Sequence, residues 1–106
     1  MKRYEIRWVN LVPASGSEMA KTRPAVIVSL DQLNAVLQTV TICPLTSHLH
    51  PGWRTRLPVK VGGHPGEIAV DQIRTVSKSR IGRKLGALRA EDASLLRRII
   101  TELYGE

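Results

Sequence analysis

Residues 24–43 have the sequence PAVIVSLDQLNAVLQTVTIC, and this stretch decides the fold class. Residues 24–29 form a continuous apolar run that ends at a serine, which predicts a buried β-strand. Residues 39–43 alternate between polar and apolar side chains and are rich in β-branched types, which predicts a second strand. Residues 31–37 between them fit one or two helical turns with Asp31 as the N-cap. The chain as a whole contains many short strands with no crossover helices between them, and this pattern favours antiparallel pairing.

More short strands are expected on both sides of this stretch. Residues 6–11 alternate in the manner of a strand with a mixed second face. Residues 57–61 and 67–70 are two further short strands, and the glycine-rich link between them suits a hairpin. A last short strand includes Ile73 and Val76.

The end of the chain has a different period. Over residues 90–104 apolar side chains recur at three- and four-residue spacing, which predicts an amphipathic helix; they are Leu95, Leu96, Ile99, Ile100 and Leu103. Glu91 and Asp92 suit its first turn, and Gly105 can end it. The sequence therefore predicts a mainly β fold with a C-terminal α-helix, arranged as a small antiparallel barrel.

Length and composition narrow the class of protein. The 106 residues, 42% of them apolar, fit one domain over residues 1–106. No apolar run is as long as the roughly 20 residues of a membrane span. No apolar run follows residues 1–5, so the sequence predicts no secretory signal. The single cysteine, Cys43, can form neither an internal disulfide nor a thiolate metal cage, and we expect it to be a small buried hydrophobe. These features favour a cytoplasmic protein without a membrane partner.

The charge favours a polyanionic partner. Lys and Arg number 16 against 9 Asp and Glu, which gives a formal net charge of +7. Residues 72–90 contain no acidic residue, and we call this segment the basic stripe; its cations are Arg74, Lys78, Arg80, Arg83, Lys84 and Arg89. Acidic membrane surfaces, acidic proteins and a merely solubilising surface charge are the alternatives.

Two polar loops gather the side chains that can do chemistry. Residues 15–23 bring hydroxyls, a carboxylate and two cationic groups together just before the buried strand. Residues 46–50 bring two hydroxyls and two imidazoles together after another strand. If the strands that hold Arg23 and Thr46 share one sheet, both polar groups emerge near one rim.

Four motifs in a fixed order resemble the MazF/PemK family of type II toxin endoribonucleases, often called mRNA interferases. The motifs are Gly16-Ser17-Glu18, the run from Lys21 to Ser29, Pro44-Leu45-Thr46-Ser47, and Asp71-Gln72-Ile73-Arg74-Thr75-Val76. The resemblance covers about residues 6–104. It implies a homodimeric, SH3-like barrel of the MazF/CcdB type that cuts single-stranded RNA selectively and is inhibited by a cognate antitoxin protein.

The resemblance also implies roles for individual residues. By motif, Arg23 and Thr46 carry catalysis. We expect RNA contacts from the same motifs and from the basic stripe, at Ser17, Lys21, Ser47, Asp71, Gln72, Arg74 and Arg80. No cofactor and no metal ligand is implied.

The chain departs from the family pattern at several positions. Tyr4-Glu5 replaces a common Gly-Asp pair, Asn10 a common Asp, and Ser77 a frequent acidic residue. Arg56 stands where an acidic residue is common, and Ala69 stands where some PemK-type members carry a basic one. We expect these changes to make the surface more basic and to alter the sequence that is cut and the antitoxin that is bound.

The chemistry fits the implied roles. Cleavage of RNA needs a base for the ribose 2′-OH, donors for the phosphorane oxygens and an acid for the leaving 5′-oxygen. Arg23 suits the second task, with its forked donors and permanent charge, and Thr46 suits positioning of the phosphate. Because the carboxylates Glu18, Glu67 and Asp71 are scattered, we expect metal-independent attack by the 2′-OH.

The remaining aromatic and imidazole side chains have several interpretations. His48, His50 and His64 lack a carboxylate or thiolate to complete a metal site, so we interpret them as solvated loop residues. His50 could still assist as an acid or base. Trp53 suits the stacking of an RNA base as well as packing in a core or against a partner.

The alternative from another class is a protein that binds without cutting. A CcdB-like toxin that acts through protein contact, or a basic nucleic-acid-binding barrel, would share the fold and the charge. The Arg23 and Thr46 motifs argue against both, since binding by charge alone does not need them.

Overall fold

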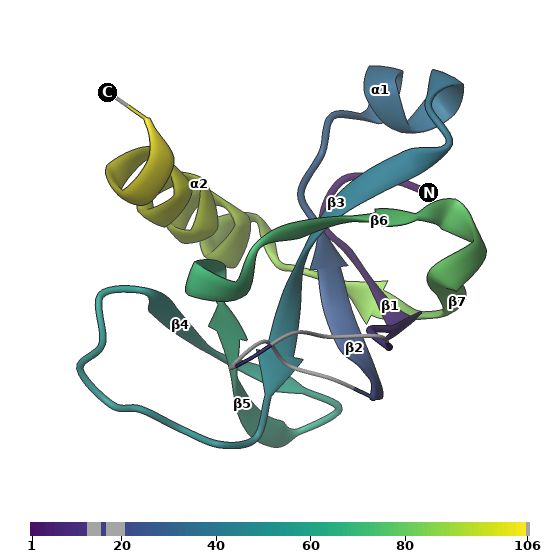
Figure 1. Cartoon of the computed structure of the whole chain (residues 1–106). Helices are drawn as coiled ribbons and strands as arrows, with labels where there is room; N and C mark the ends of the chain where they lie inside the picture. Colours follow the sequence, from purple (N-terminus) through teal and green to yellow (C-terminus); the bar gives the residue numbers. More distant parts are fainter. Residues whose placement is uncertain (13–15, 17–20, 106) are drawn as a thin grey trace.

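A curved antiparallel sheet and a C-terminal helix dominate the part of the chain that the computed structural model describes, residues 1–12, 16 and 21–105 (Figure 1). The strands are β1 (Glu5–Asn10), β2 (Thr22–Ile27), β3 (Thr39–Thr46), β4 (Arg56–Val61), β5 (His64–Ala69), β6 (Arg74–Ser77) and β7 (Ile81–Ala87). The α-helices are α1 (Asp31–Val36) and α2 (Ala90–Tyr104), and the 3-10 turns are η1 (Val70–Gln72) and η2 (Lys78–Arg80).

Strand β3 is the centre of the sheet. The strands follow the order β4-β5-β3-β2-β1-β7, and β6 pairs with the first half of β3. The second half of β3 pairs with β5, where Leu45 faces Ile68 and Thr46 faces Glu67. Since β3 divides its length between two partners, the sheet bends there into a half-barrel. The expected mainly β, antiparallel fold with a C-terminal helix is confirmed.

Side chains of β2 and β3 point alternately into two apolar cores. Val26 and Cys43 belong to a core that α2 covers, whereas Ala25, Ile27 and Ile42 belong to a second core on the other face. A strand that is buried on both faces needs apolar residues at every position rather than at alternate ones. This double burial explains the continuous apolar run in residues 24–29.

Helix α2 has the bounds that the sequence predicts. Ala93 and Leu96 are buried, and Ile99, Ile100 and Leu103 pack against the first core. At the end of the helix the Tyr104 hydroxyl donates to the Val70 carbonyl oxygen over 2.9 Å, which ties α2 to η1.

The expected β4–β5 hairpin is present, but its turn is shorter than the predicted link of residues 62–66, because β5 begins at His64. Val61 pairs with His64 across two residues, Gly62 and Gly63, with φ of 58° and 82°. Positive φ at both central positions matches the twist of the flanking strands and favours glycine.

Two local predictions are wrong, and one strand was not predicted. Asp31 is the first helical residue instead of the N-cap, and its carboxylate accepts the Arg3 backbone N–H over 2.6 Å. Strand β3 extends to Thr46, beyond residues 39–43, because Pro44 and Leu45 are buried in the sheet. Strand β7 lies in the basic stripe, where mostly exposed and half-buried residues leave no apolar alternation to indicate a strand.

Two expectations from composition are also tested. Cys43 is fully buried, as predicted, and burial together with the negative charge of Asp71 raises the pKa of its thiol to about 12. Among the described residues no helix has the length and apolarity that a membrane crossing requires.

Candidate active site

Arg23 and Thr46 meet at one edge of the sheet. Strands β2 and β3 pair as far as Ala25 opposite Pro44, and Arg23 and Thr46 each lie two residues beyond this pair. Both residues line the same two cavities. The structure therefore brings the two residues to one rim, as expected if their strands share a sheet.

Every residue that lines the smaller of these cavities has a polar or charged side chain. This cavity has a volume of about 250 Å³ and is lined by Arg23, Thr46, His48, His50 and Arg56. Several hydrogen-bond donors and permanent positive charge therefore surround a small space. They come from two guanidinium groups, a hydroxyl and two imidazoles. This set of donors suits a phosphate group.

An adjoining cavity of about 460 Å³ extends along the β4–β5 hairpin. It shares Arg23, Thr46 and His48 with the smaller one and adds Ser47 and His64. A Cβ at Gly66 would lie 3.2 Å from the Thr46 carbonyl oxygen, so the missing side chain lets β5 approach the end of β3 closely.

The Thr46 hydroxyl is oriented by the loop that follows it. Its Oγ1 accepts the His48 backbone N–H over 3.0 Å. A hydroxyl that accepts one hydrogen bond still carries a proton to donate, and a phosphate oxygen can accept it. This geometry supports a positioning role for Thr46.

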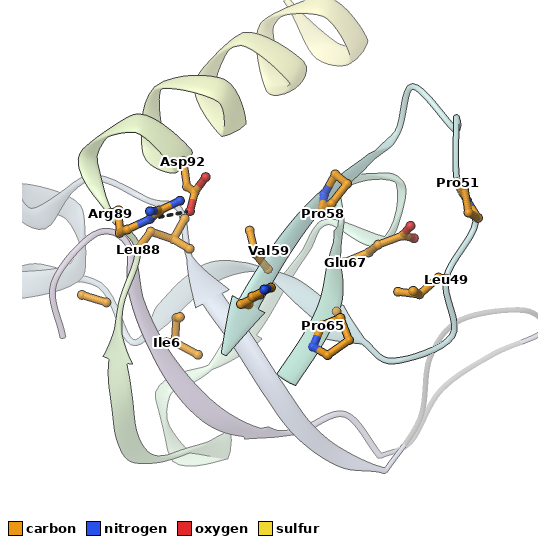
Figure 2. A pocket seen from close by; sticks show the side chains of 13 residues that line it. Ile6, Leu49, Pro51, Pro58, Val59, Pro65, Glu67, Leu88, Arg89 and Asp92 are labelled. Atoms are coloured by element: carbon orange, nitrogen blue, oxygen red, sulfur yellow. Dashed lines mark hydrogen bonds and ion pairs between the residues drawn. The ribbon is translucent and has the colours of Figure 1, made fainter. Parts of the chain in front are cut away.

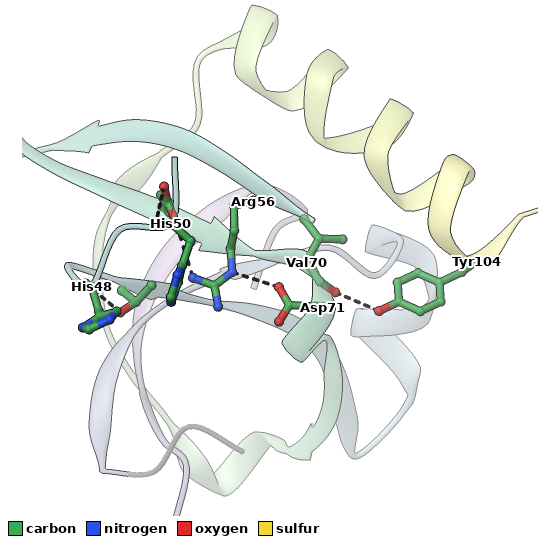
Figure 3. Close-up of polar contacts among 8 residues, drawn as sticks. His48, His50, Arg56, Val70, Asp71 and Tyr104 are labelled. Carbon is green, nitrogen blue, oxygen red and sulfur yellow. Dashed lines mark hydrogen bonds and ion pairs between the residues drawn. The ribbon is translucent and has the colours of Figure 1, made fainter. Parts of the chain in front are cut away.

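Arg56 is held inside the protein by two carboxylates (Figure 3). Its Nε donates to Asp71 Oδ1 over 2.9 Å, and its Nη1 lies 3.4 Å from Glu67 Oε1. The side chains of Arg56 and Glu67 are only 6% and 3% exposed. The expectation that Arg56 adds to the basic surface is therefore wrong, because the guanidinium is buried and faces the small cavity.

The position of Arg56 relates to another departure from the family pattern. Arg56 on β4 pairs directly with Ala69 on β5. In this chain the guanidinium at the site therefore comes from β4. In some PemK-type members a basic residue stands on the neighbouring strand β5, at the position of Ala69. Sequence reasoning missed Arg56 as a site residue, since only the strand register places it across from Ala69.

His50 and Trp53 form an ordered aromatic pair. Their ring centroids lie 3.8 Å apart with an interplanar angle of 16°, and the Arg56 guanidinium lies 5.1 Å from the Trp53 ring centroid. The His50 backbone N–H donates to both oxygens of Glu67 over 3.0 and 3.1 Å. His50 is therefore not the solvated loop residue that the sequence suggests, and Trp53 stacks on His50 while about half of it stays exposed.

The Asp-Gln motif reaches the cavity through Arg56. Burial acts to raise the pKa of Asp71, but hydrogen bonds from Arg56 and Thr55 and the charge of Arg56 hold it below its ordinary value. Asp71 therefore stays ionised and keeps Arg56 in place. Gln72 and Arg74 are half-buried and do not line either cavity.

The other expected RNA contacts are spread over the surface. Lys21 is exposed just before β2. Arg80 donates through Nη1 to the carbonyl oxygens of Asn10 and Val12, so it also holds the end of β1. Ser17 lies outside the described residues.

The cations of the basic stripe do not form one uniform face. Lys84 pairs with Glu5 over 3.4 Å, and Arg89 pairs with Glu91 and Asp92. Carboxylates from outside the stripe therefore neutralise part of its charge, which sequence position alone does not reveal.

A larger cavity lies between the hairpin and the start of α2 (Figure 2). It has a volume of about 750 Å³, and its walls are mainly apolar, with Ile6, Val59, Pro65 and Leu88 among them. Arg23 and Thr46 do not line it. The two smaller cavities are therefore the candidate site.

A cluster of metal ligands is not found in the described part of the chain. Within residues 1–12, 16 and 21–105, no group of three His, Cys, Asp or Glu side chains could hold a metal ion. Glu67 and Asp71 are instead bound to Arg56.

Comparison with known proteins finds one family. Residues 2–104 match the family of the PemK-like, MazF-like toxin of type II toxin-antitoxin system. Among individual proteins, the chain is 33% identical to Endoribonuclease MazF9 of Mycobacterium tuberculosis, over 91% of this chain and 89% of that relative.

Solved structures agree in fold. The crystal structure of MazF from Deinococcus radiodurans has a TM-score of 0.86 and 27% identity, and the match covers all of this chain and 97% of that one. An endoribonuclease from a Mycobacterial species, solved in complex with its cognate antitoxin, has a TM-score of 0.82 at 19% identity, over 99% and 95% of the two chains. At that identity the second match supports the fold alone.

Proposed function

Since the chain belongs to the PemK-like, MazF-like toxin family of type II toxin-antitoxin systems, we propose that it cuts single-stranded RNA at selected sequences. The cut is made by attack of a ribose 2′-OH on the neighbouring phosphate, and cleavage of mRNA inhibits translation and growth. The observation that carries this proposal is the small cavity, which Arg23, Thr46 and the buried Arg56 line together.

We expect the residues that line the cavity to have different roles in the reaction. Arg23 donates two parallel hydrogen bonds to the phosphate oxygens as negative charge develops on them in the transition state. Thr46 donates to the phosphate and fixes its place. Arg56 adds hydrogen-bond donors, and because Glu67 and Asp71 already orient its guanidinium, little reorganisation is needed when negative charge develops on the phosphate.

We assign no metal ion or cofactor to the reaction. The attacking 2′-OH is already held next to the phosphorus by the RNA itself, so the reaction needs less ordering than the recruitment of a water molecule. Cleavage is therefore expected to continue in EDTA and to leave a 2′,3′-cyclic phosphate and a 5′-OH end.

Two protein partners follow from the family. The toxin works in the cytoplasm as a homodimer and is inhibited by a cognate antitoxin protein. Membership of a family of toxins of type II toxin-antitoxin systems supports the antitoxin part of this proposal. Exposed apolar side chains on and beside α1 also suit a protein contact; they are Leu30, Leu33, Val36 and Leu37.

Incubation with a long single-stranded RNA tests the proposal. The wild-type protein is expected to give discrete fragments, and Arg23→Ala is expected to leave the RNA whole while binding it. Arg98→Ala is the matched control, because Arg98 is an exposed arginine on α2 away from both cavities. An intact but shifted RNA band with the wild-type protein would instead show a binding protein of the kind that its charge of +7 also allows.

A further inference from the structure

Attack by a ribose 2′-OH needs a group that takes its proton. The guanidinium groups of Arg23 and Arg56 are poor candidates, since a guanidinium stays protonated and has no lone pair to accept a proton. The Thr46 hydroxyl is a weak base, and its Oγ1 already accepts the His48 N–H. The proton acceptor must therefore be another group at the cavity.

The two nearby carboxylates are engaged in other contacts. Glu67 accepts the His50 backbone N–H with both oxygens and lies against Arg56. The Asp71 carboxylate accepts from Arg56 Nε over 2.9 Å, and its pKa is lowered. A carboxylate stabilised in this way is a weaker base than a free one. Neither carboxylate is among the residues that line the small cavity.

An imidazole is the remaining neutral base, and of the two at the cavity His50 is the better ordered. The Trp53 ring is stacked on it at 3.8 Å, and Glu67 fixes its backbone. His48 is exposed, and its ring lies 5.0 Å from the His50 ring at a tilt of 48°. A catalytic group held by packing and by hydrogen bonds needs no ordering when substrate binds.

We propose that His50 is the general base of this site, an assignment that rests on the proposed RNA cleavage. A neutral ring nitrogen of His50 takes the proton of the 2′-OH as that oxygen bonds to phosphorus. The bond from phosphorus to the 5′-oxygen breaks, and the 5′-oxygen takes a proton from water in the open cleft. The imidazolium then returns its proton to solvent, so no net charge or proton accumulates.

Charged groups from several elements lie around His50. Arg23 from β2 and Arg56 from β4 line the same cavity and are permanent cations, and His48 lies in the same loop. Glu67 from β5 and Asp71 from η1 are both bound to Arg56.

The pH dependence of single-turnover cleavage tests the assignment, with the full chain and an RNA that contains the cut site. In the wild-type protein the rate is expected to fall as the pH drops from 8 to 5, because protonation of His50 removes the base. His50→Gln is expected to cut about 10²–10⁴-fold more slowly at pH 8 and to lose this fall. His48→Gln is expected to keep the fall, whatever its absolute rate.

Two further measurements separate catalysis from structure. His50→Gln should unfold at the wild-type temperature and bind a 2′-deoxy analogue within about threefold of wild-type affinity. Added imidazole should raise the rate of His50→Ala, since it supplies the missing base, and should leave Arg23→Ala inactive. A His50→Gln protein with the wild-type rate and pH profile would overturn the role of His50 alone. A wild-type protein that cuts no RNA would overturn the proposed function as well.

Discussion

The Arg56 guanidinium donates to Asp71 over 2.9 Å and so joins strand β4 to the 3-10 turn that follows β5. The same guanidinium lies 3.4 Å from Glu67, whose carboxylate holds the backbone of His50. One buried cation thus connects the hairpin, the Asp-Gln motif and the loop that carries the histidines. This connection makes Arg56 a structural centre of the site as well as part of its wall.

Loss of Arg56 is expected to be costly. Arg56→Met should lower the free energy of unfolding by about 3–5 kcal/mol, because it leaves the buried Glu67 without its counter-charge. Arg54→Met is the matched control, since Arg54 is 77% exposed and its ion pair with Glu102 is weak. Denaturant unfolding measures both variants. Equally small losses of unfolding free energy in the two variants would contradict the stabilising role of Arg56.

Replacement of Arg23 should separate charge from geometry. Arg23→Ala is expected to slow cleavage at least 10²-fold, as for loss of one preorganised donor to a developing oxyanion. Arg23→Lys should recover little, since an ammonium group cannot make two parallel hydrogen bonds. Single-turnover rates are the measurement, and unchanged thermal unfolding is the control. Full activity in the lysine variant would show that charge alone is enough.

The basic stripe gives a prediction about salt. Arg83→Glu is expected to weaken binding across many RNA sequences and to flatten the dependence of affinity on salt, as for a lost phosphate contact. Arg80→Glu should do the same and should also lower stability, because Arg80 holds the carbonyl oxygens of Asn10 and Val12. Unchanged RNA affinity with a loss of dimer in sedimentation would assign these positions to the dimer instead.

Glu5 predicts a dependence of stability on pH. Burial acts to raise the pKa of Glu5, but hydrogen bonds from the Lys2 backbone and from Arg7, with Lys84, lower it from 4.5 to about 2. A carboxyl whose pKa is lower in the folded state stabilises the fold above its unfolded pKa. The stability should therefore fall as the pH drops from about 4.5 to about 2.

Glu5→Gln checks this dependence. The variant should lose about 1.5–3 kcal/mol at pH 7, as for charge-assisted hydrogen bonds, and its stability should fall less between pH 4.5 and pH 2. Denaturant unfolding at several pH values is the measurement. Parallel curves for wild type and variant over that range would contradict the role of Glu5.

Much of the fold can be predicted from local sequence. Helix α2 repeats its apolar residues at helical spacing, and the Gly62-Gly63 turn fits a hairpin. Strand β7 could not be predicted, since a mostly exposed strand needs no apolar alternation. Pro44 and Leu45 suggested the start of a loop, but the pairing of β3 with β2 and β5 extends the strand to Thr46.

The candidate site was only partly predictable for a similar reason. Arg23 and Thr46 stand in motifs that a reader of the sequence can find. Arg56 and Glu67 become partners only because strands β4 and β5 pair, with Arg56 beside Ala69 and Pro58 beside Glu67. His50 acquires its order from Trp53 and Glu67, and the sequence alone gives no sign of either contact.

The central claim is that this site cuts RNA through the 2′-OH, and one substrate tests it most directly. The cut site is first located on an unmodified RNA in EDTA, and the same RNA is then made with a single 2′-deoxy sugar on the 5′ side of the cut. The deoxy RNA is expected to bind with nearly the same affinity and to stay whole, while the unmodified RNA gives a 2′,3′-cyclic phosphate and a 5′-OH end. Cleavage of the deoxy RNA at the same position would contradict the mechanism.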